Sequence, residues 1–241
     1  MKALQEIIDK GKRIVFFGGA GVSTASGIPD FRSGDGLYAK EYDGLTAEMM
    51  LSQSFFYLHP DRFYTFYRAH MLHPEAEPNA AHRKLAELER AGKLSGLMTQ
   101  NIDGLHRAAG NRLVYELHGS VHENACIECG RRYGLGYILN TQGVPKCESC
   151  GGVVKPSVVL YGEGLDHYVS TGACREISRC DVLIVAGTSL TVEPAASFLG
   201  YFRGGARKLV VINREETPAD ARASLVIRGD AEKVLKDIEI R

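Results

Sequence analysis

The sequence predicts an α/β protein built on a doubly wound parallel sheet with helices on both faces, joined to a smaller inserted part. Two observations carry this prediction. Short runs that are apolar throughout recur along the chain, and helical patterns lie between several of them. The runs cover residues 13–17, 94–99, 113–117, 153–160, 182–186, 209–212 and 225–227. Strands without polar alternation are typical of a sheet buried on both faces, so these runs are assigned to one such sheet.

Composition and charge are those of an ordinary globular enzyme. Of the 241 residues, 44% are hydrophobic and 24% are charged, and 29 basic side chains balance 29 acidic ones. A neutral chain gives no electrostatic argument for nucleic acid or for an anionic membrane. No apolar run approaches the ~20 residues of a membrane helix, and the first residues do not resemble a signal peptide. We therefore expect a cytoplasmic monomer with no specific nucleic-acid partner and no membrane association.

The first predicted elements are a helix over 2–10, whose apolar residues recur at helical spacing, and a strand over 13–17. The strand ends in the turn 18–21, which reads Gly-Gly-Ala-Gly. Glycine lets a backbone approach a pyrophosphate, and a helix opening after the turn would stabilise the negative charge. The spacing differs from the dinucleotide fingerprint Gly-x-Gly-x-x-Gly, so a tight turn without a ligand is an equally good interpretation.

Two stretches interrupt the alternation of strands and helices. Residues 37–78 are rich in aromatic side chains and favour helix without a clear strand, and residues 119–152 hold four cysteines and several glycines. We interpret both as inserts that together form a small second part. Just before the first insert, residues 26–33 combine Gly, Pro, Asp, Phe and Arg, which suits a loop that folds over a ligand; a surface turn is the alternative. After that insert, Asn79 is placed to cap a helix over 80–91.

Four of the six cysteines have the spacing of a metal site. They form two Cys-x-x-Cys pairs: Cys126 and Cys129, then Cys147 and Cys150. In a reducing compartment such pairs favour a metal over a disulfide, and two of them complete a tetrahedron around one zinc ion. Because four protein ligands leave no position for water or substrate, we predict a structural zinc rather than a catalytic one. Two redox-active dithiols are the competing interpretation, and Cys174 and Cys180 are interpreted as small buried apolar residues or spectator thiols.

Polar residues follow several of the predicted strands at their carboxyl ends, where open α/β sheets bind ligands. They are Gln100, Asn101, Asp103, His118, Thr188, Ser189 and Asn213. His118 is a candidate general base, because the imidazole pKa lies near neutral pH. A lone histidine is more often structural, and each of the other stretches taken alone could be an ordinary turn.

Taken together, these stretches resemble the sirtuins, a family of NAD-dependent protein-lysine deacylases. The matching segments stand in the family's order and cover nearly the whole chain: 19–23, 27–32, 99–103, 118–119, the four cysteines, 187–190 and Asn213. The resemblance implies a large Rossmann-like domain plus a small domain made of a zinc ribbon and a helical module. We place the large NAD-binding domain at 1–36, 79–119 and 153–241. The small domain then comprises 37–78, the helical module, and 120–152, the zinc ribbon.

The resemblance also implies roles for individual residues. His118 matches the family's catalytic base, with Asn101 as a second catalytic residue. The implied NAD contacts are Ala20, Ser23, Thr24, Phe31, Arg32, Gln100, Asn101, Ile102, Asp103, His118, Thr188, Ser189, Asn213, Asp230 and Ala231. The implied substrate contacts are Val158, Val159, Leu160, Tyr161 and Gly162, a stretch that pairs with the peptide backbone by strand addition. Many members of the family have Phe where Tyr161 stands, which could alter contacts beside the acyl-lysine.

The implied reaction converts acetyl-lysine, NAD and water into lysine, nicotinamide and O-acetyl-ADP-ribose. NAD is consumed as a co-substrate, so the enzyme is a transferase that acts as a protein deacetylase, and acetylated proteins or peptides are its partners. His118 takes a proton from a ribose hydroxyl in this scheme. The alternatives are a sirtuin that acts mainly on succinyl or malonyl groups or as an ADP-ribosyltransferase. A nicotinamide-dependent dehydrogenase and a zinc-ribbon binding module without catalysis are more distant ones.

The acyl preference depends on one short stretch of the helical module. Sirtuins that prefer succinyl or malonyl groups carry a Tyr-x-x-Arg pair there, whose Arg binds the distal carboxylate. Residues 64–68 read Tyr-Thr-Phe-Tyr-Arg, so Arg68 stands one place after the position that the pair requires. One residue along a helix turns a side chain by about 100°. We therefore expect acetyl-lysine to be the preferred substrate.

Overall fold

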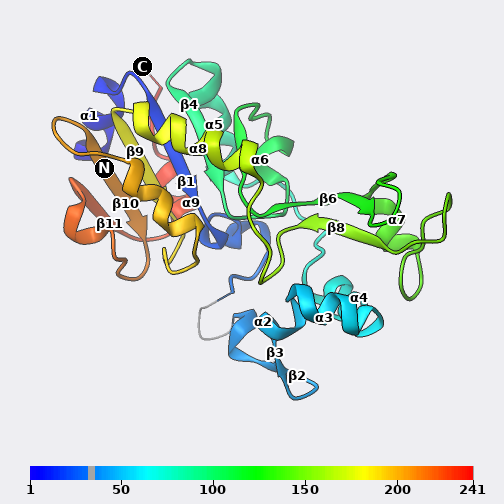
Figure 1. Cartoon of the computed structure of the whole chain (residues 1–241). Helices are drawn as coiled ribbons and strands as arrows, with labels where there is room; N and C mark the ends of the chain where they lie inside the picture. The colour runs from blue at the N-terminus through cyan, green and yellow to red at the C-terminus, as the bar shows by residue number, and fades with distance from the viewer. Residues whose placement is uncertain (32–35, 241) are drawn as a thin grey trace.

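The structure, a computed structural model, describes residues 1–31 and 36–240. Figure 1 shows a larger body built around a sheet, with two inserted segments of the chain lying together beside it. Arg32, one of the expected NAD contacts, lies outside the described residues.

The larger body contains a six-stranded sheet in the order β11-β10-β9-β1-β4-β5. Every neighbouring pair in it is parallel. The strands are β1 (Ile14–Gly18), β4 (Leu94–Thr99), β5 (Val114–Glu116), β9 (Val182–Ala186), β10 (Lys208–Asn213) and β11 (Leu225–Arg228). They coincide with six of the seven apolar runs, which confirms the doubly wound parallel sheet.

The seventh run was assigned wrongly. Residues 153–160 contain β8 (Val154–Val158), which pairs antiparallel with β6 (Gly119–Cys126) in a separate sheet of order β7-β6-β8. The side chains of β8 alternate between buried and accessible positions, with Val154, Pro156 and Val158 buried. This period of two is the mark of a strand with one covered face, and Lys155 already interrupts the run in the sequence.

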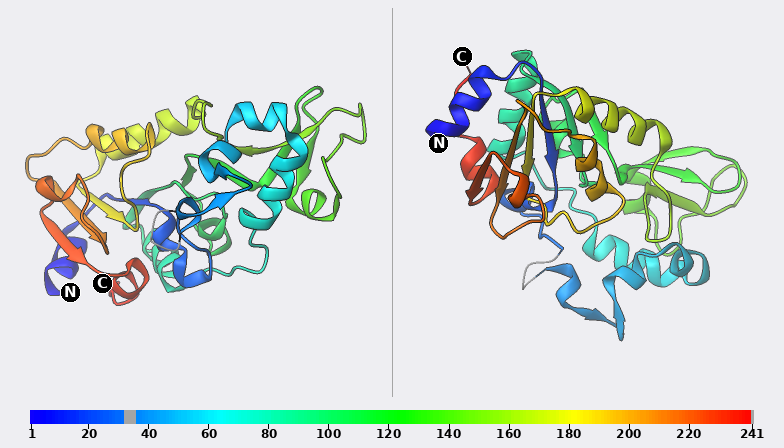
Figure 2. Two further views of the ribbon diagram at one scale, coloured as in Figure 1. Left: turned by 90° about the horizontal axis from the view of Figure 1, so that it is seen from below. Right: turned by 60° about the vertical axis from the view of Figure 1, so that its left-hand side comes forward.

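Helices cover both faces of the parallel sheet. The first face is covered by α1 (Lys2–Lys10), α5 (Ala80–Arg90) and α9 (Ala231–Leu235), and the second by α8 (His167–Arg179) and the 3₁₀ segment η4 (Ala195–Tyr201). In β1, Ile14 and Phe16 pack on the first face, and Val15 and Phe17 on the second. Figure 2 shows α1 and α9 on the opposite side of the sheet from α8. None of the described helices combines the length and the apolar character needed to span a bilayer.

Local signals in the sequence place several of these boundaries. The predicted helix over 2–10 is α1, and Asn79 caps α5 as expected, because its Oδ1 accepts the amides of Ala81 at 2.9 Å and His82 at 3.4 Å. The glycine turn after β1 does not open an α-helix, however. Two 3₁₀ turns follow it, η1 (Ala20–Val22) and η2 (Thr24–Ser26). Three further short helices are α6 (Leu105–Ala108), η3 (Leu37–Ala39) and η5 (Asp220–Arg222).

The inserted segments share a core of their own. Its elements are α2 (Ala47–Met50), α3 (Gln53–Leu58), α4 (Pro60–His70), α7 (Leu135–Asn140), the hairpin β2 (Glu41–Tyr42) with β3 (Leu45–Thr46), and the sheet β7 (Arg132–Gly134), β6 and β8. Aromatic side chains of α3 and α4, among them Phe56 and Tyr67, form one buried cluster with Val121, Ile138 and Val154 of the cysteine-bearing segment. The hairpin β2–β3 is a small departure from the expected purely helical segment.

Arg68 joins the two inserted segments through backbone carbonyls. Its Nε donates to the carbonyl of Ile138 at 2.9 Å, and its NH2 group donates to that of Gly143 at 2.7 Å. The Tyr64 hydroxyl donates to the carbonyl of Val154 in β8. The helical segment and the ribbon segment are therefore linked by hydrogen bonds as well as by the shared core.

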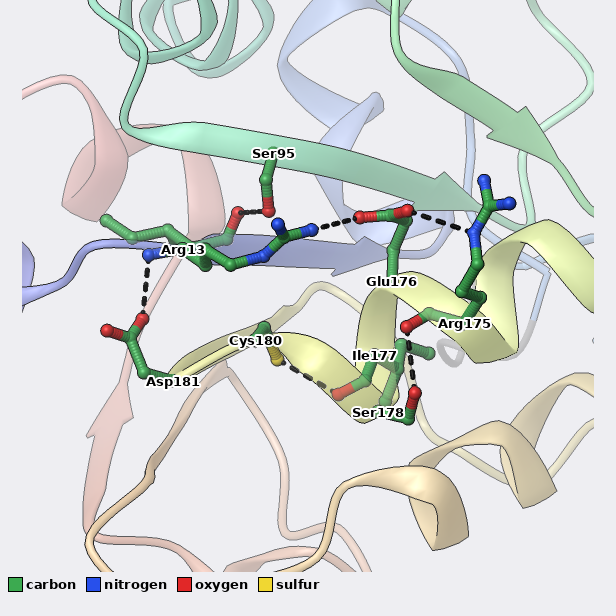
Figure 3. Close-up of polar contacts among 9 residues, drawn as sticks. Arg13, Ser95, Arg175, Glu176, Ile177, Ser178, Cys180 and Asp181 are labelled. Atoms are coloured by element: carbon green, nitrogen blue, oxygen red, sulfur yellow. Dashed lines mark hydrogen bonds and ion pairs between the residues drawn. The ribbon is translucent and has the colours of Figure 1, made fainter.

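An ion-pair cluster fixes the amino-terminal edge of the parallel sheet (Figure 3). Arg13, just before β1, donates to Glu176 of α8 at 2.7 Å, and Arg175 contacts the other oxygen of Glu176 at 3.4 Å. Asp181 accepts the backbone amide of Arg13 at 2.9 Å, and Ser95 donates to the carbonyl of the first residue of β1 at 3.1 Å. These contacts hold β1, β4 and α8 together at the edge opposite the carboxyl ends of the strands.

Candidate active site

A cavity of about 360 Å³ lies at the carboxyl ends of β1, β4, β9 and β10. Residues of the first insert, 37–78, and of the segment 158–165 complete its wall. Its volume falls in the range of ordinary ligand pockets. Among the expected site residues, those that line it are Ala20, Ser23, Phe31, Gln100, Asn101, Ile102, Asp103, His118, Val158, Val159, Leu160, Tyr161, Gly162, Thr188, Ser189, Asn213, Asp230 and Ala231. Thr24 does not line it; its hydroxyl donates to the carbonyl of Gly21 at 3.2 Å.

The glycine turn after β1 packs closely against the end of β9. The Gly21 amide donates to the Gly187 carbonyl at 2.9 Å, and a Cβ on Gly21 would lie 2.8 Å from the Gly187 Cα. A Cβ on Gly19 would lie 2.7 Å from the Thr188 Cβ. Glycine is thus required here for the approach of two strand ends. Among the described residues none accepts the Ala20 amide, which leaves that amide available to an anion in the cavity.

Side chains from three strand ends form a hydrogen-bonded floor. Asn101 donates to the Ser23 hydroxyl at 2.9 Å, and Ser23 donates to Asp103 at 2.7 Å. Thr188 donates to the side-chain oxygen of Gln100 at 2.7 Å. The Gln100 Nε2 is buried and has no hydrogen-bond partner among the described residues. A buried amide without a partner costs free energy, so a carbonyl or phosphate oxygen in the cavity would satisfy it.

His118 stands between β5 and β6, and Gln100 orients its ring. The Nδ1 lies 2.9 Å from the backbone carbonyl of Gln100. A carbonyl only accepts, so Nδ1 carries the proton and Nε2 keeps its lone pair. Burial lowers the pKa of His118, and the bond to Gln100 only partly opposes this shift. The neutral imidazole is therefore a hydrogen-bond acceptor at neutral pH. Gly119 follows with φ +75°, and a Cβ there would lie 1.9 Å from the Ser157 carbonyl oxygen.

Two buried histidines below the floor were not predicted from the sequence. His82 of α5 lies 3.4 Å from the Ser23 hydroxyl, and burial lowers its pKa to about 4. His106 of α6 packs against His82 with ring centroids 4.6 Å apart, and burial lowers its pKa as well. Both histidines lie in helical patterns among apolar residues, and such patterns do not predict that α5 and α6 meet beneath the cavity. Both rings are neutral at physiological pH, and His82 contacts Ser23 while His106 packs behind His82.

The four cysteines of the ribbon gather at one point. Their sulfur atoms all lie within 4.8 Å of one another. Cys126 and Cys150 approach to 3.4 Å, and Cys129 and Cys147 to 3.5 Å. Disulfide sulfurs would lie about 2.05 Å apart, whereas the ligands of a tetrahedral zinc–thiolate site lie about 3.8 Å apart. The cluster thus fits one zinc ion and confirms the predicted metal site.

One hydrogen bond in the ribbon favours the thiolate form of Cys147. Tyr133 donates its hydroxyl to the Cys147 sulfur at 3.2 Å, and this bond is the main reason that the pKa of Cys147 falls to about 6. Metal ligation requires the thiolate, so a low pKa favours binding at neutral pH. None of the four cysteines lines the cavity. The ion would therefore act on the ribbon and not on a reacting group.

Tyr67 and Arg68 face different surroundings. Tyr67 lines the cavity, and its hydroxyl is fully buried without a hydrogen-bond partner among the described residues. Arg68 does not line the cavity, because its guanidinium is held by the two carbonyls of the ribbon segment. Other residues that complete the wall were not predicted from the sequence: Tyr38, His70, Met71, His73, Val192, Glu193, Arg214 and Glu215.

Comparison with known proteins agrees with this geometry. Residues 19–194 match the model of the Sir2 family. The chain is 52% identical over 233 residues to an NAD-dependent protein deacetylase of Clostridium perfringens, spanning 96% of this chain and 95% of the relative. It is 54% identical to an NAD-dependent protein deacetylase of Cutibacterium acnes, spanning 96% and 94%. A solved structure of Sir2 with a p53 peptide and NAD⁺ superimposes with a TM-score of 0.87 at 36% identity, covering 98% of this chain and 95% of that one.

Proposed function

The chain belongs to the Sir2 family and is an NAD-dependent protein deacetylase, and we propose that His118 and Asn101 carry its catalysis in the cavity at the carboxyl edge of the parallel sheet. The reaction converts acetyl-lysine, NAD and water into lysine, nicotinamide and O-acetyl-ADP-ribose. The observation that carries the proposed site is the meeting of a neutral His118, with Nε2 free to accept a proton, and a buried Gln100 amide without a partner. NAD, when bound, supplies the ribose carbon that gives up nicotinamide.

The residues that line the cavity can be assigned to the phosphates, the nicotinamide end and the adenosine end of NAD. We propose that the Ala20 amide and Ser23 hold the phosphates and the adjoining ribose, because they stand at the turn after β1. The nicotinamide end is assigned to Phe31, Gln100, Asn101, Ile102 and Asp103, and the adenosine end to Thr188, Ser189, Asn213, Asp230 and Ala231. Thr24 supports the turn through its bond to Gly21, and Arg32 stays a proposal from the resemblance alone.

The rate of deacetylation should depend on the protonation state of His118 and should fall when the ring is protonated. Since burial lowers its pKa, the ring stays neutral to pH values below the ordinary 6.5 and protonates only at lower pH. We expect the acid limb of kcat/KM to be centred below pH 6.5. A pH–rate profile with saturating NAD measures this limb. An acid limb centred above 7 would contradict the assignment of His118 as the base.

The substrate segment 158–162 is hydrogen-bonded to the protein at some of its backbone groups and leaves others without a partner among the described residues. His118 accepts the Val159 amide at 2.9 Å through its backbone carbonyl, and Glu163 accepts the Leu160 amide at 2.9 Å. The Val159 carbonyl and the Gly162 amide have no hydrogen-bond partner among the described residues. We propose that an acetylated peptide adds as a strand to these two groups, which places its acetyl-lysine in the cavity.

Acetyl-lysine is the proposed substrate rather than succinyl- or malonyl-lysine. Tyr67 stands at the position that the carboxylate-binding Arg would take, and Arg68 is committed to the carbonyls of Ile138 and Gly143. A carboxylate without a partner in this buried place would be strongly disfavoured. We expect kcat/KM for a succinyl-lysine peptide to be at least ~10-fold below that for the matched acetyl-lysine peptide, as for other unpaired buried polar groups. Equal values would contradict the proposal.

Incubation with NAD and an acetyl-lysine peptide, followed by mass spectrometry, tests the reaction itself. The expected products are the free-lysine peptide, nicotinamide and O-acetyl-ADP-ribose in equal amounts. Transfer of ADP-ribose to the protein or peptide would instead identify an ADP-ribosyltransferase. Reduction of NAD, followed by absorbance, would identify a dehydrogenase.

The setting of the enzyme is also proposed. A four-thiolate zinc site forms in a reducing compartment, which supports a cytoplasmic location. The proposed partners are acetylated proteins, with no specific nucleic acid, and the proposed assembly is a monomer. We keep the division into a large domain at 1–36, 79–119 and 153–241 and a small domain at 37–78 and 120–152. The separate core of the inserts supports this division, although β8 belongs to the ribbon sheet.

A further inference from the structure

Two tyrosines from distant parts of the chain meet on the wall of the cavity. The hydroxyls of Tyr38 and Tyr161 share a hydrogen bond of 2.6 Å, and their ring centroids lie 6.4 Å apart. Tyr38 lies in η3 at the start of the helical module, and Tyr161 belongs to the proposed substrate segment. Both line the cavity. The contact therefore connects the side of the cavity proposed for NAD with the side proposed for the acetylated peptide.

Tyr161 is the fixed member of the pair. Its amide donates to the Leu51 carbonyl at 3.0 Å, and its carbonyl accepts the Gln53 amide at 2.9 Å. These bonds secure it to the junction between α2 and α3 through its backbone at both ends. The residue is 38% exposed, so its hydroxyl is accessible to a partner side chain.

Tyr38 is linked to a proposed NAD contact. Its amide donates to the Phe31 carbonyl at 2.9 Å, and the two rings contact each other with centroids 5.4 Å apart. The Leu37 amide also donates to the Asp30 carbonyl at 3.3 Å. A change in the position of Tyr38 would therefore reach Phe31 through one backbone bond and one ring contact.

We propose that the Tyr161 hydroxyl is a positioning group for NAD. It holds Tyr38, and through Tyr38 it holds Phe31 against the cofactor side of the cavity. The inference rests on the proposed function, since it takes Phe31 as an NAD contact. A phenylalanine at position 161 would keep the ring and the backbone bonds to Leu51 and Gln53 but could not hold Tyr38. The Tyr161 hydroxyl, which belongs to the peptide-binding segment, thus contributes to the affinity for NAD.

The test is a double-mutant cycle with Tyr161→Phe and Tyr38→Phe. Each single variant is expected to raise KM for NAD about fivefold, which corresponds to about 1 kcal/mol for one hydrogen bond. The effect should fall on KM for NAD and on the calorimetric Kd for NAD, rather than on kcat. The double variant should be no worse than either single variant, because both remove the same bond. Tyr168→Phe is the matched control, since Tyr168 is 86% exposed and does not line the cavity.

Unchanged NAD affinity in both single variants, or additive losses in the double variant, would overturn the positioning role. If a substitution weakened the whole fold instead, the variant would have a lower urea midpoint and a lower kcat. Unchanged values of both in the single variants exclude this explanation. Wild-type turnover, followed by the products in the mass spectrum, tests the deacetylase function separately. The calorimetric Kd for NAD reports on the tyrosine pair even where turnover is absent.

Discussion

His118→Ala is expected to lower kcat for deacetylation by ~10²–10⁴, the contribution typical of a general base. The substitution removes one side-chain hydrogen bond, from Nδ1 to the Gln100 carbonyl, and leaves the backbone bond between the His118 carbonyl and Val159 in place. The fold should therefore persist while proton transfer is lost. Nicotinamide release and peptide deacetylation, quantified from the same reaction, measure the loss.

His167→Ala provides the matched control for this substitution. His167 is exposed at the start of α8 and does not line the cavity, so its removal should leave kcat unchanged. Circular dichroism and zinc content of His118→Ala should equal those of the wild type. Turnover within a few fold of the wild type in that variant would refute its role as the base.

Cys129→Ala is expected to release the zinc and to destabilise the protein by several kcal/mol, since structural zinc contributes about 10–16 kcal/mol to the folding of small zinc-finger peptides. Three thiolates would remain crowded together without a fourth ligand. Activity should be lost with the metal, although no cysteine lines the cavity. The reason is geometric: β6 begins directly after His118, and β8 leads directly into Val159. If the ribbon loses its ordered structure, His118 and Val159 are no longer held in position.

Metal analysis and urea unfolding of the purified proteins check this prediction. The wild type should hold one zinc per chain, and Cys129→Ala should hold none and unfold at lower urea. Cys174→Ala serves as the control, because Cys174 lies on α8 outside the cluster. A wild-type protein without zinc, or a Cys129→Ala variant with a full complement, would contradict the site.

The sheet could be predicted because buried parallel strands leave a simple pattern. Runs such as 182–186 and 209–212 are apolar at every position, since both of their faces are covered. The same rule failed for β8, where Lys155 and Ser157 alternate with buried residues. An apolar run identifies a strand, but only the alternation within it tells how many faces are covered.

The cavity was predictable to the extent that it depends on strand ends. Gln100, Asn101 and Thr188 follow strands directly, so the rule that ligands bind at carboxyl ends places them together. His82 and Tyr38 could not be found in this way. Each reaches the site from an element whose position depends on tertiary packing, and no spacing in the sequence reports such a contact.

The position of β1 has a consequence for the synthesis of the chain. This strand is made early, yet it lies in the middle of the sheet, and its partner β9 follows about 170 residues later. At 5–20 residues per second, the ribosome needs about 8–35 seconds to deliver that partner. Throughout this time the apolar segment Ile14–Gly18 has at least one unpaired edge, open to other nascent chains. Slow translation and chaperone capture would therefore matter most for the first strand made.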